Sequence, residues 1–142
     1  MNMMEMVLAL FAVVLFTSTA AMYTRQIMDH NDYLINATQY VQATQLCHTA
    51  LDEIDAKLFA KMITFSSVRT TYANLNRTID LAFPGDVYNL NIRAVACDSL
   101  GIPITNPEVN HIYVRVQVRA TTAGLRFPVI MQRVYTKTHL NI

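Results

Sequence analysis

The chain opens with the stretch "MNMMEMVLAL FAVVLFTSTA AMYTRQ", residues 1–26, and this stretch sets the main requirement on the fold. From Met6 to Thr24 its 19 residues carry no charge. In a helix they would span about 28 Å, close to the hydrocarbon thickness of a bilayer. Glu5 comes just before this run, and the first basic residue, Arg25, just after it. The stretch therefore predicts an apolar helix that requires lipid or other apolar helices around it.

A cleaved signal peptide is the competing interpretation of the same residues. The letters "TSTAA" at 17–21 offer the small side chains that a signal peptidase prefers. A signal peptide also has a basic region before its apolar run, and none is present here. We therefore expect the apolar segment to be retained.

The sequence permits a very long helix, because neither Gly nor Pro occurs before Pro84. After Arg25, apolar or small residues recur at spacings of three, four or seven, which is typical of one helical face. They are Ile27, Leu34, Ala37, Val41, Thr44, Cys47, Leu51, Ile54, Leu58 and Met62. The letters "TFSS" at 64–67 mark the predicted end. A continuous helix of roughly 60 residues would be about 90 Å long.

Strand patterns appear after the turn "PGD" at 84–86. Apolar residues alternate with polar ones from Tyr88 to Ala96 and again from Ile112 to Arg119, the period of a half-buried strand. A third strand follows "TTAG", and Pro128 within it indicates an edge position or an irregular start. Its expected inward side chains are Leu125, Phe127, Val129 and Met131.

These patterns predict an α+β fold, in which a long N-terminal helix carries a small antiparallel sheet packed on its C-terminal half. A chain of 142 residues has room for one modest domain beside the apolar segment. The expected parts are an apolar helix half (1–25), an amphipathic helix half (26–65), a connector with a possible short strand or helix (66–86) and the sheet of a globular head (87–142).

The formal net charge of +1 hides an uneven distribution, because residues 109–142 contain five Lys or Arg and no acid. Arg115 and Arg119 point the same way on one predicted strand, and Arg126, Arg133 and Lys137 add charge nearby. One interpretation is a basic outer surface that binds DNA or an acidic polymer. The other is lateral pairing with acidic residues of neighbouring subunits. The nearly neutral chain favours lateral pairing.

Two cysteines, Cys47 and Cys97, would lie on the helix and at the end of the first predicted strand of the sheet. An apolar N-terminus implies export to a compartment where a disulfide persists, so we interpret the pair as a bridge. It would close a loop of about 50 residues and contribute on the order of 4 kcal/mol. The alternative is two free buried cysteines.

The sequence offers no candidate for catalysis, for a cofactor or for a metal site. The chain contains only three glycines, no glycine-rich phosphate loop and no recognisable nucleophile motif. Its histidines lack metal-ligand spacing; they are His30, His48, His111 and His139. The acidic cluster Asp52, Glu53 and Asp55 is interpreted as a solvated helix face. We therefore predict that the protein is not an enzyme.

Glu5 needs a partner, because an ionisable side chain at an apolar span is costly and usually marks a functional site. The nearest cation is an α-amino group, that of Met1 in the same chain or in a neighbouring molecule. At about 4 Å and an effective dielectric constant near 20, such a pair is worth about 4 kcal/mol before desolvation is subtracted. The pair would favour one axial offset between packed helices.

Together, the N-terminal Met1, Glu5 four positions later, the uncharged helix, its amphipathic continuation and the sheet resemble a mature bacterial type IV pilin, divergent or minimal in form. The motif-bearing part is about the first 25 residues. The resemblance implies that a prepilin peptidase removes a leader before Met1 and that the new amine is methylated. It also implies that Glu5 pairs with the N-terminus of a subunit in the growing fibre. Met22 stands where many pilins have Pro.

The resemblance implies a structural subunit that polymerises into a type IV pilus for adhesion, surface motility or DNA uptake. Its partners would be copies of itself, the inner membrane before assembly, the prepilin peptidase and the pilus assembly machinery. It would be stored in the inner membrane and then form an extracellular surface filament. One alternative is a pseudopilin of a type II secretion system. Another is a membrane-anchored periplasmic binding domain, in which Glu5 is incidental.

Overall fold

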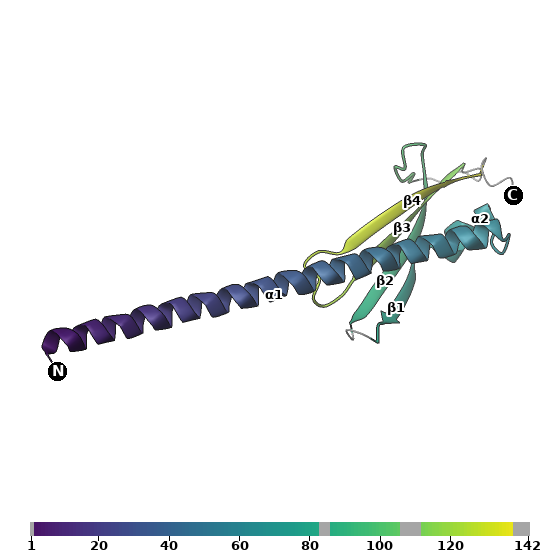
Figure 1. The fold of residues 1–142 in the computed structure, drawn as a ribbon. Coiled ribbons are helices and arrows are strands. Elements are labelled where there is room, and N and C mark those ends of the chain that lie inside the picture. Colours follow the sequence, from purple (N-terminus) through teal and green to yellow (C-terminus); the bar gives the residue numbers. More distant parts are fainter. Residues whose placement is uncertain (1, 83–85, 106–111, 138–142) are drawn as a thin grey trace. The chain divides into compact units, whose positions relative to one another are not determined.

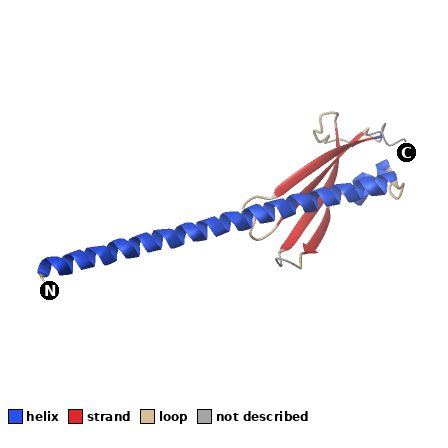
Figure 2. Ribbon diagram, in the orientation of Figure 1, coloured by secondary structure: helices blue, strands red, loops and turns tan. Residues whose placement is uncertain are grey.

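The computed structural model describes residues 2–82, 86–105 and 112–137. The elements in them are α1 (Met3–Phe59), α2 (Phe65–Thr71), β1 (Leu75–Asp80), β2 (Val87–Cys97), β3 (Tyr113–Thr121) and β4 (Val129–Thr136) (Figure 1). Helices come first along the chain and strands follow, which confirms the predicted α+β fold (Figure 2). Contacts divide the chain into two units, Met1–Ala37 and Thr38–Ile142.

The four strands form one antiparallel meander in the order β1-β2-β3-β4, so each strand pairs with its neighbours in sequence. β1 and β4 are therefore the two edges of the sheet. Pro128 immediately precedes β4, which confirms the edge position that proline indicates. Phe127 was expected to point inward, but it is 78% exposed, because β4 begins only at Val129.

The core lies between one face of this sheet, α2 and the part of α1 from Ala43 onward. Figure 1 shows this part of α1 lying along the sheet. The alternation predicted for β2 and β3 is confirmed, since every second side chain is buried. The largest fully buried side chains are Tyr88, Leu51, Ile54, Leu58, Leu90, Ile92, Val68, Val116, Val118 and Cys47. Burying one such aliphatic or aromatic side chain contributes about 1.5–3 kcal/mol.

The buried face of α1 agrees with the sequence pattern at Cys47, Leu51, Ile54 and Leu58. Met62, expected on the same face, lies beyond the end of α1 and is 74% exposed. Val41 was expected on this face, yet its side chain is 62% exposed. Ala43 and Ala50 are buried in its place and pack in the core. The positions 41, 44 and 47 and the positions 43, 47 and 50 both follow spacings of three or four, so periodicity alone does not choose between them.

α1 ends at Phe59, before the predicted end at 64–67. The N–H of Met62 bonds to the carbonyl of Lys57 (2.9 Å), and the N–H of Lys61 bonds to the carbonyl of Leu58 (3.1 Å). Lys61 has a φ of 55°, the left-handed conformation in which helices commonly stop. This is a Schellman motif with lysine at the position that glycine usually occupies, so the sequence carries no obvious stop signal.

The connector predicted over residues 66–86 contains both a helix and a strand. Thr64 is the N-cap of α2, and its backbone N–H donates to Ser67 Oγ (3.0 Å) in the first turn. Val68 of this helix is fully buried in the core. Tyr72 then accepts a bond from the N–H of Ala94 in β2 (2.6 Å), which fixes the end of α2 against the sheet.

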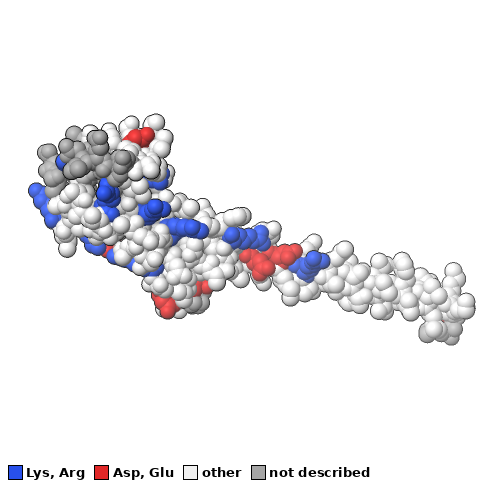
Figure 3. Space-filling view, turned by 180° about the vertical axis from the view of Figure 1, so that it is seen from behind, with Lys and Arg blue, Asp and Glu red and all other residues white. Residues whose placement is uncertain are grey.

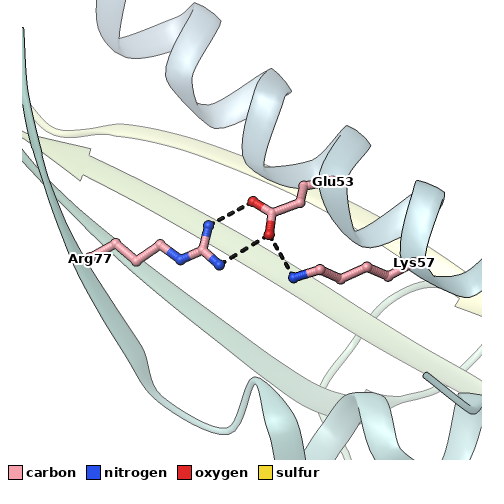
Figure 4. A network of polar contacts seen from close by, with 3 residues as sticks. All are labelled: Glu53, Lys57 and Arg77. Atoms are coloured by element: carbon pink, nitrogen blue, oxygen red, sulfur yellow. Dashed lines mark hydrogen bonds and ion pairs between the residues drawn. The ribbon is translucent and has the colours of Figure 1, made fainter. Parts of the chain in front are cut away.

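Ion pairs link α1 to both edges of the sheet. Arg77 of β1 forms a two-pronged pair with Glu53, with N–O distances of 2.6 and 3.1 Å, and Lys57 Nζ lies 2.6 Å from the same carboxylate (Figure 4). At the other edge, Arg133 of β4 pairs with Asp55 and with Asp52 Oδ1 (3.2 Å). The acidic cluster interpreted as a solvated face therefore joins the two layers.

Substitution of core and exposed positions on α1 tests the observed packing face. Replacement Ile54→Ala removes a buried side chain and leaves a cavity, so it should lower the free energy of unfolding by about 2–5 kcal/mol. Replacement Val41→Ala, at an exposed position of the same helix, is the matched control and should change it by less than about 0.5 kcal/mol. Urea unfolding of the full chain in a non-ionic detergent measures both. Similar losses for the two variants would contradict the packing.

The pH dependence of stability tests the Glu53 pair. The hydrogen bonds from Arg77 and Lys57 lower the pKa of Glu53 from 4.5 to about 2. A depressed carboxyl pKa stabilises the folded state above the unfolded pKa, and this stabilisation is lost as pH falls from about 4.5 to 2. Replacement Glu53→Gln should therefore flatten the acid limb of stability in this window. Replacement Asp80→Asn, at an exposed carboxyl at the end of β1, should leave that limb unchanged.

Candidate assembly surface

The first unit of the chain presents a continuous apolar helical surface. All described residues from 2 to 35 are exposed, and the exposed fraction reaches 75% at Phe16 and 83% at Met3. This part of α1 is long and apolar enough to cross a membrane by length and composition. Monomeric soluble proteins rarely expose a contiguous apolar patch larger than a few hundred Å². The surface therefore requires lipid or protein to cover it.

The polar side chains within this surface are satisfied by the helix itself. The hydroxyls of Thr17, Ser18 and Thr24 donate to backbone carbonyls three or four residues earlier, at 2.8–3.0 Å. Thr19 donates to the carbonyls of Leu15 and Phe16 in the same way. Such bonds remove the need for water around the hydroxyls. The segment can thus be surrounded by apolar groups without leaving these donors unpaired.

Glu5 lies in the first turn of α1, where it contacts the start of its own helix. Its Oε2 accepts a hydrogen bond from the backbone N–H of Asn2 (3.1 Å), as a glutamate does in a capping box. A carboxylate there also interacts favourably with the helix dipole. Met1, the expected site of processing and methylation, lies outside the described residues. The structure therefore gives Glu5 a local role in addition to the intermolecular one inferred from the sequence.

The two arginines singled out on β3 lie on the same outer face of the sheet, but their surroundings differ. Arg115 is half-buried, and its Nη1 donates to the carbonyl of Gly101 (3.0 Å), which fixes the loop after β2. Arg119 is exposed. Arg133 was expected to add charge near these two arginines, but it faces α1 instead. Its spacing from Val129 and Met131 is even, so strict alternation along β4 would have placed it correctly.

The predicted disulfide is wrong in this structure, where Cys47 and Cys97 are both free and buried. Cys47 Sγ lies 4.0 Å from the carbonyl oxygen of Val118, which pairs across the sheet with Ile92. Cys97 lies five residues beyond Ile92 on β2, which is about 17 Å at the rise of a strand. Because five is an odd number, its side chain points to the opposite face of the sheet. A disulfide needs Cα atoms within about 7 Å.

No metal-binding cluster of His, Cys, Asp or Glu occurs in the part of the chain that the structure describes. His111 and His139 lie outside that part. The sequence reading also missed the edge arginines Arg77 and Arg133, which pair with α1. Alternation along each strand was the available signal, since Arg77 shares the parity of the half-buried Leu75 and Ile79, and Arg133 shares that of Met131 and Tyr135. Comparisons with protein-family models, curated proteins and solved structures found no match for this chain.

Alkylation measures the state of the cysteines directly. Full-length protein isolated under oxidising conditions and denatured without reductant should take up two alkyl groups, as measured by intact mass. In the native state Cys47 should react slowly at neutral pH, because burial raises the pKa of its thiol to about 11. Uptake of two groups only after prior reduction would show that a bridge exists.

Proposed function

We propose that this protein is a structural subunit that polymerises through its N-terminal helix into a filament of the type IV pilus kind. The observation that carries the proposal is the exposed, uncharged surface from Met6 to Thr24, preceded by the single carboxylate Glu5. The same helix continues into the folded unit that starts at Thr38, so each subunit would join an apolar assembly segment to a folded head.

Membrane storage and filament growth use the same apolar surface in turn. Before assembly, lipid covers it, and the hydroxyls that bond back to the helix tolerate this environment. After extraction, helices of neighbouring copies replace the lipid. A head-to-tail contact that repeats without closing generates a helical filament. The apolar helices then form its dry core, and the heads lie outside.

Glu5 would set the axial offset between neighbouring subunits in this filament. Its Oε2 bonds to the N–H of Asn2, and its exposed carboxylate remains available to the α-amine of another copy. The family resemblance implies a methylated amine at Met1, a prepilin peptidase that creates it and a machinery that drives assembly. Adhesion, surface motility and DNA uptake are the activities that such a filament supports. It would pass from the inner membrane to the cell surface.

A membrane-anchored periplasmic binding domain is the second candidate, and the bond between Asn2 and Glu5 favours it. If capping its own helix is the whole role of Glu5, the carboxylate needs no intermolecular partner. The protein would then remain monomeric in detergent. A pseudopilin of a type II secretion system would share the assembly surface and form a short periplasmic fibre.

Two substitutions of Glu5 separate charge pairing from capping. Replacement Glu5→Gln keeps an acceptor for the Asn2 N–H but removes the charge, whereas Glu5→Ala removes both. Pairing with a neighbouring amine predicts that both variants reach the membrane at normal levels and lose filament formation by at least tenfold. Electron microscopy and immunoblotting of sheared cell-surface fractions measure filaments, and membrane fractions measure stored subunit. Replacement Asp29→Ala, at an exposed carboxylate farther along α1, should leave filament yield unchanged.

The same experiment can reject the proposal. Filaments at normal yield from Glu5→Gln would mean that the residue only caps the helix. Absence of the wild-type chain from the sheared fraction, with its Met1 amine unmodified in the membrane by mass spectrometry, would favour the anchored binding domain.

A further inference from the structure

The outer face of the sheet, turned away from α1, carries a grid of polar side chains across β1, β2 and β3. Strand register places them in two adjoining rows, Asn76–Asn91–Arg119 and Thr78–Asn89–Thr121. These six side chains, which we call the polar grid, line a shallow groove of about 540 Å³. Neighbouring strands lie about 4.8 Å apart, so each row presents a polar group at that interval.

Hydrogen bonds within the polar grid fix its side chains and leave donors for a ligand. Asn91 Nδ2 donates to the Oδ1 atoms of Asn76 (2.6 Å) and Asn74 (2.7 Å). Thr78 Oγ1 donates to Asn89 Oδ1 (3.2 Å). These bonds occupy the amide oxygens of Asn76 and Asn89 and leave their amide N–H groups without a partner among the described residues. The groove is therefore rich in donors, which suits a ligand with many oxygen atoms.

The charge around the polar grid is mainly positive. Arg93 on β2 lies diagonally between Arg115 and Arg119 on β3, and neither of these strands contains an acid. The acid on the same face of β1 is Asp80, two residues beyond Thr78. Arg93 and Arg119 are exposed, and neither forms an ion pair with a described residue. Figure 3, seen from behind relative to Figure 1, shows Lys and Arg side chains spread over the head on this side. An anionic ligand would therefore be attracted to this face.

We propose that the polar grid binds an acidic oligosaccharide. The planar guanidinium of Arg119 pairs with a sugar carboxylate through two parallel hydrogen bonds. The asparagine amides and threonine hydroxyls bond to the hydroxyl groups of the same or the next sugar. Unlike a bare cationic patch, this arrangement places one charge among several neutral hydrogen-bonding groups, and a uronic acid polymer likewise presents each carboxylate among hydroxyl groups.

Nucleic acid fits the polar grid less well. Affinity for DNA comes mainly from cationic side chains that neutralise many phosphates. The grid contributes one guanidinium, Arg93 adds a second beside it, and Arg115 is engaged with the carbonyl of Gly101. Single-stranded nucleic acid also requires aromatic side chains on which bases stack, and the grid has none.

The experiment measures binding of a fluorescently labelled oligogalacturonate to the full chain in non-ionic detergent, by anisotropy. Replacement Arg119→Gln should weaken binding at least tenfold, because it removes a charge-assisted pair. Replacement Thr121→Val keeps the shape of the side chain and removes one hydroxyl, so it should weaken binding severalfold. Replacement Lys61→Gln removes the same charge from the exposed loop after α1 and should have no effect. Near-UV circular dichroism confirms that each variant is folded.

Any of four outcomes would overturn the proposal. The first is no binding of the oligogalacturonate, and the second is an equal loss of affinity in Lys61→Gln and Arg119→Gln. The third is equally tight binding of polyglutamate of matched charge, which would show a non-specific cationic surface. Duplex DNA serves as competitor, and tighter binding of DNA with the same Arg119 dependence would assign the face to nucleic acid instead. The site lies within the unit Thr38–Ile142, so failed filament assembly would leave this result unaffected.

Discussion

The apolar seam between α1 and the buried face of the sheet is the contact on which the folded unit depends. Ile54, Leu58 and Val118 are among the side chains that it removes from water, each worth about 1.5–3 kcal/mol. The ion pairs at the two sheet edges are partly exposed, and exposed pairs contribute at most about 1 kcal/mol. Hydrophobic burial therefore supplies most of the stability, and the arginines of β1 and β4 fix how the helix lies across the sheet.

One helix meets two opposite requirements along its length. From Ala43 onward, its inward side chains are buried in the head. Up to residue 35 its apolar side chains are exposed, and its hydroxyls bond back to the helix. The core of the head is complete without the exposed segment, so the apolar surface is left for lipid or for other copies. This division of the helix connects the fold to the proposed filament.

The outer face of the sheet is subject to neither of these two requirements. Its alternate positions need not pack against the helix, so they are unconstrained by the core; they hold amides, hydroxyls and arginines together with apolar residues such as Val87 and Val95. Arg115 stabilises the loop after β2 through Gly101, while Arg119 stays exposed beside Asn91. Two arginines four residues apart on one strand thus differ in role because different segments cover them.

Local patterns predicted the elements better than their partners. The alternation in β2 and β3 was correct because burial of one sheet face imposes a period of two on each strand. The expectation at Val41 was wrong because alanines occupy the seam there. The predicted disulfide was wrong because the helix-on-sheet arrangement alone does not fix strand register. The register places Cys97 far from Cys47 and on the opposite face of the sheet. For the candidate assembly surface, the sequence identified both the uncharged helix and Glu5, but not the Asn2 contact.

The sequence by itself determined the long helix, its uncharged start and the antiparallel sheet, because the absence of Gly and Pro and the period of apolar residues act locally. Only the tertiary structure decided which face of that helix is buried, which arginines pair with it and how the polar grid is aligned. These properties arise from strand register and from contacts between residues far apart in the chain, and a local pattern does not contain them.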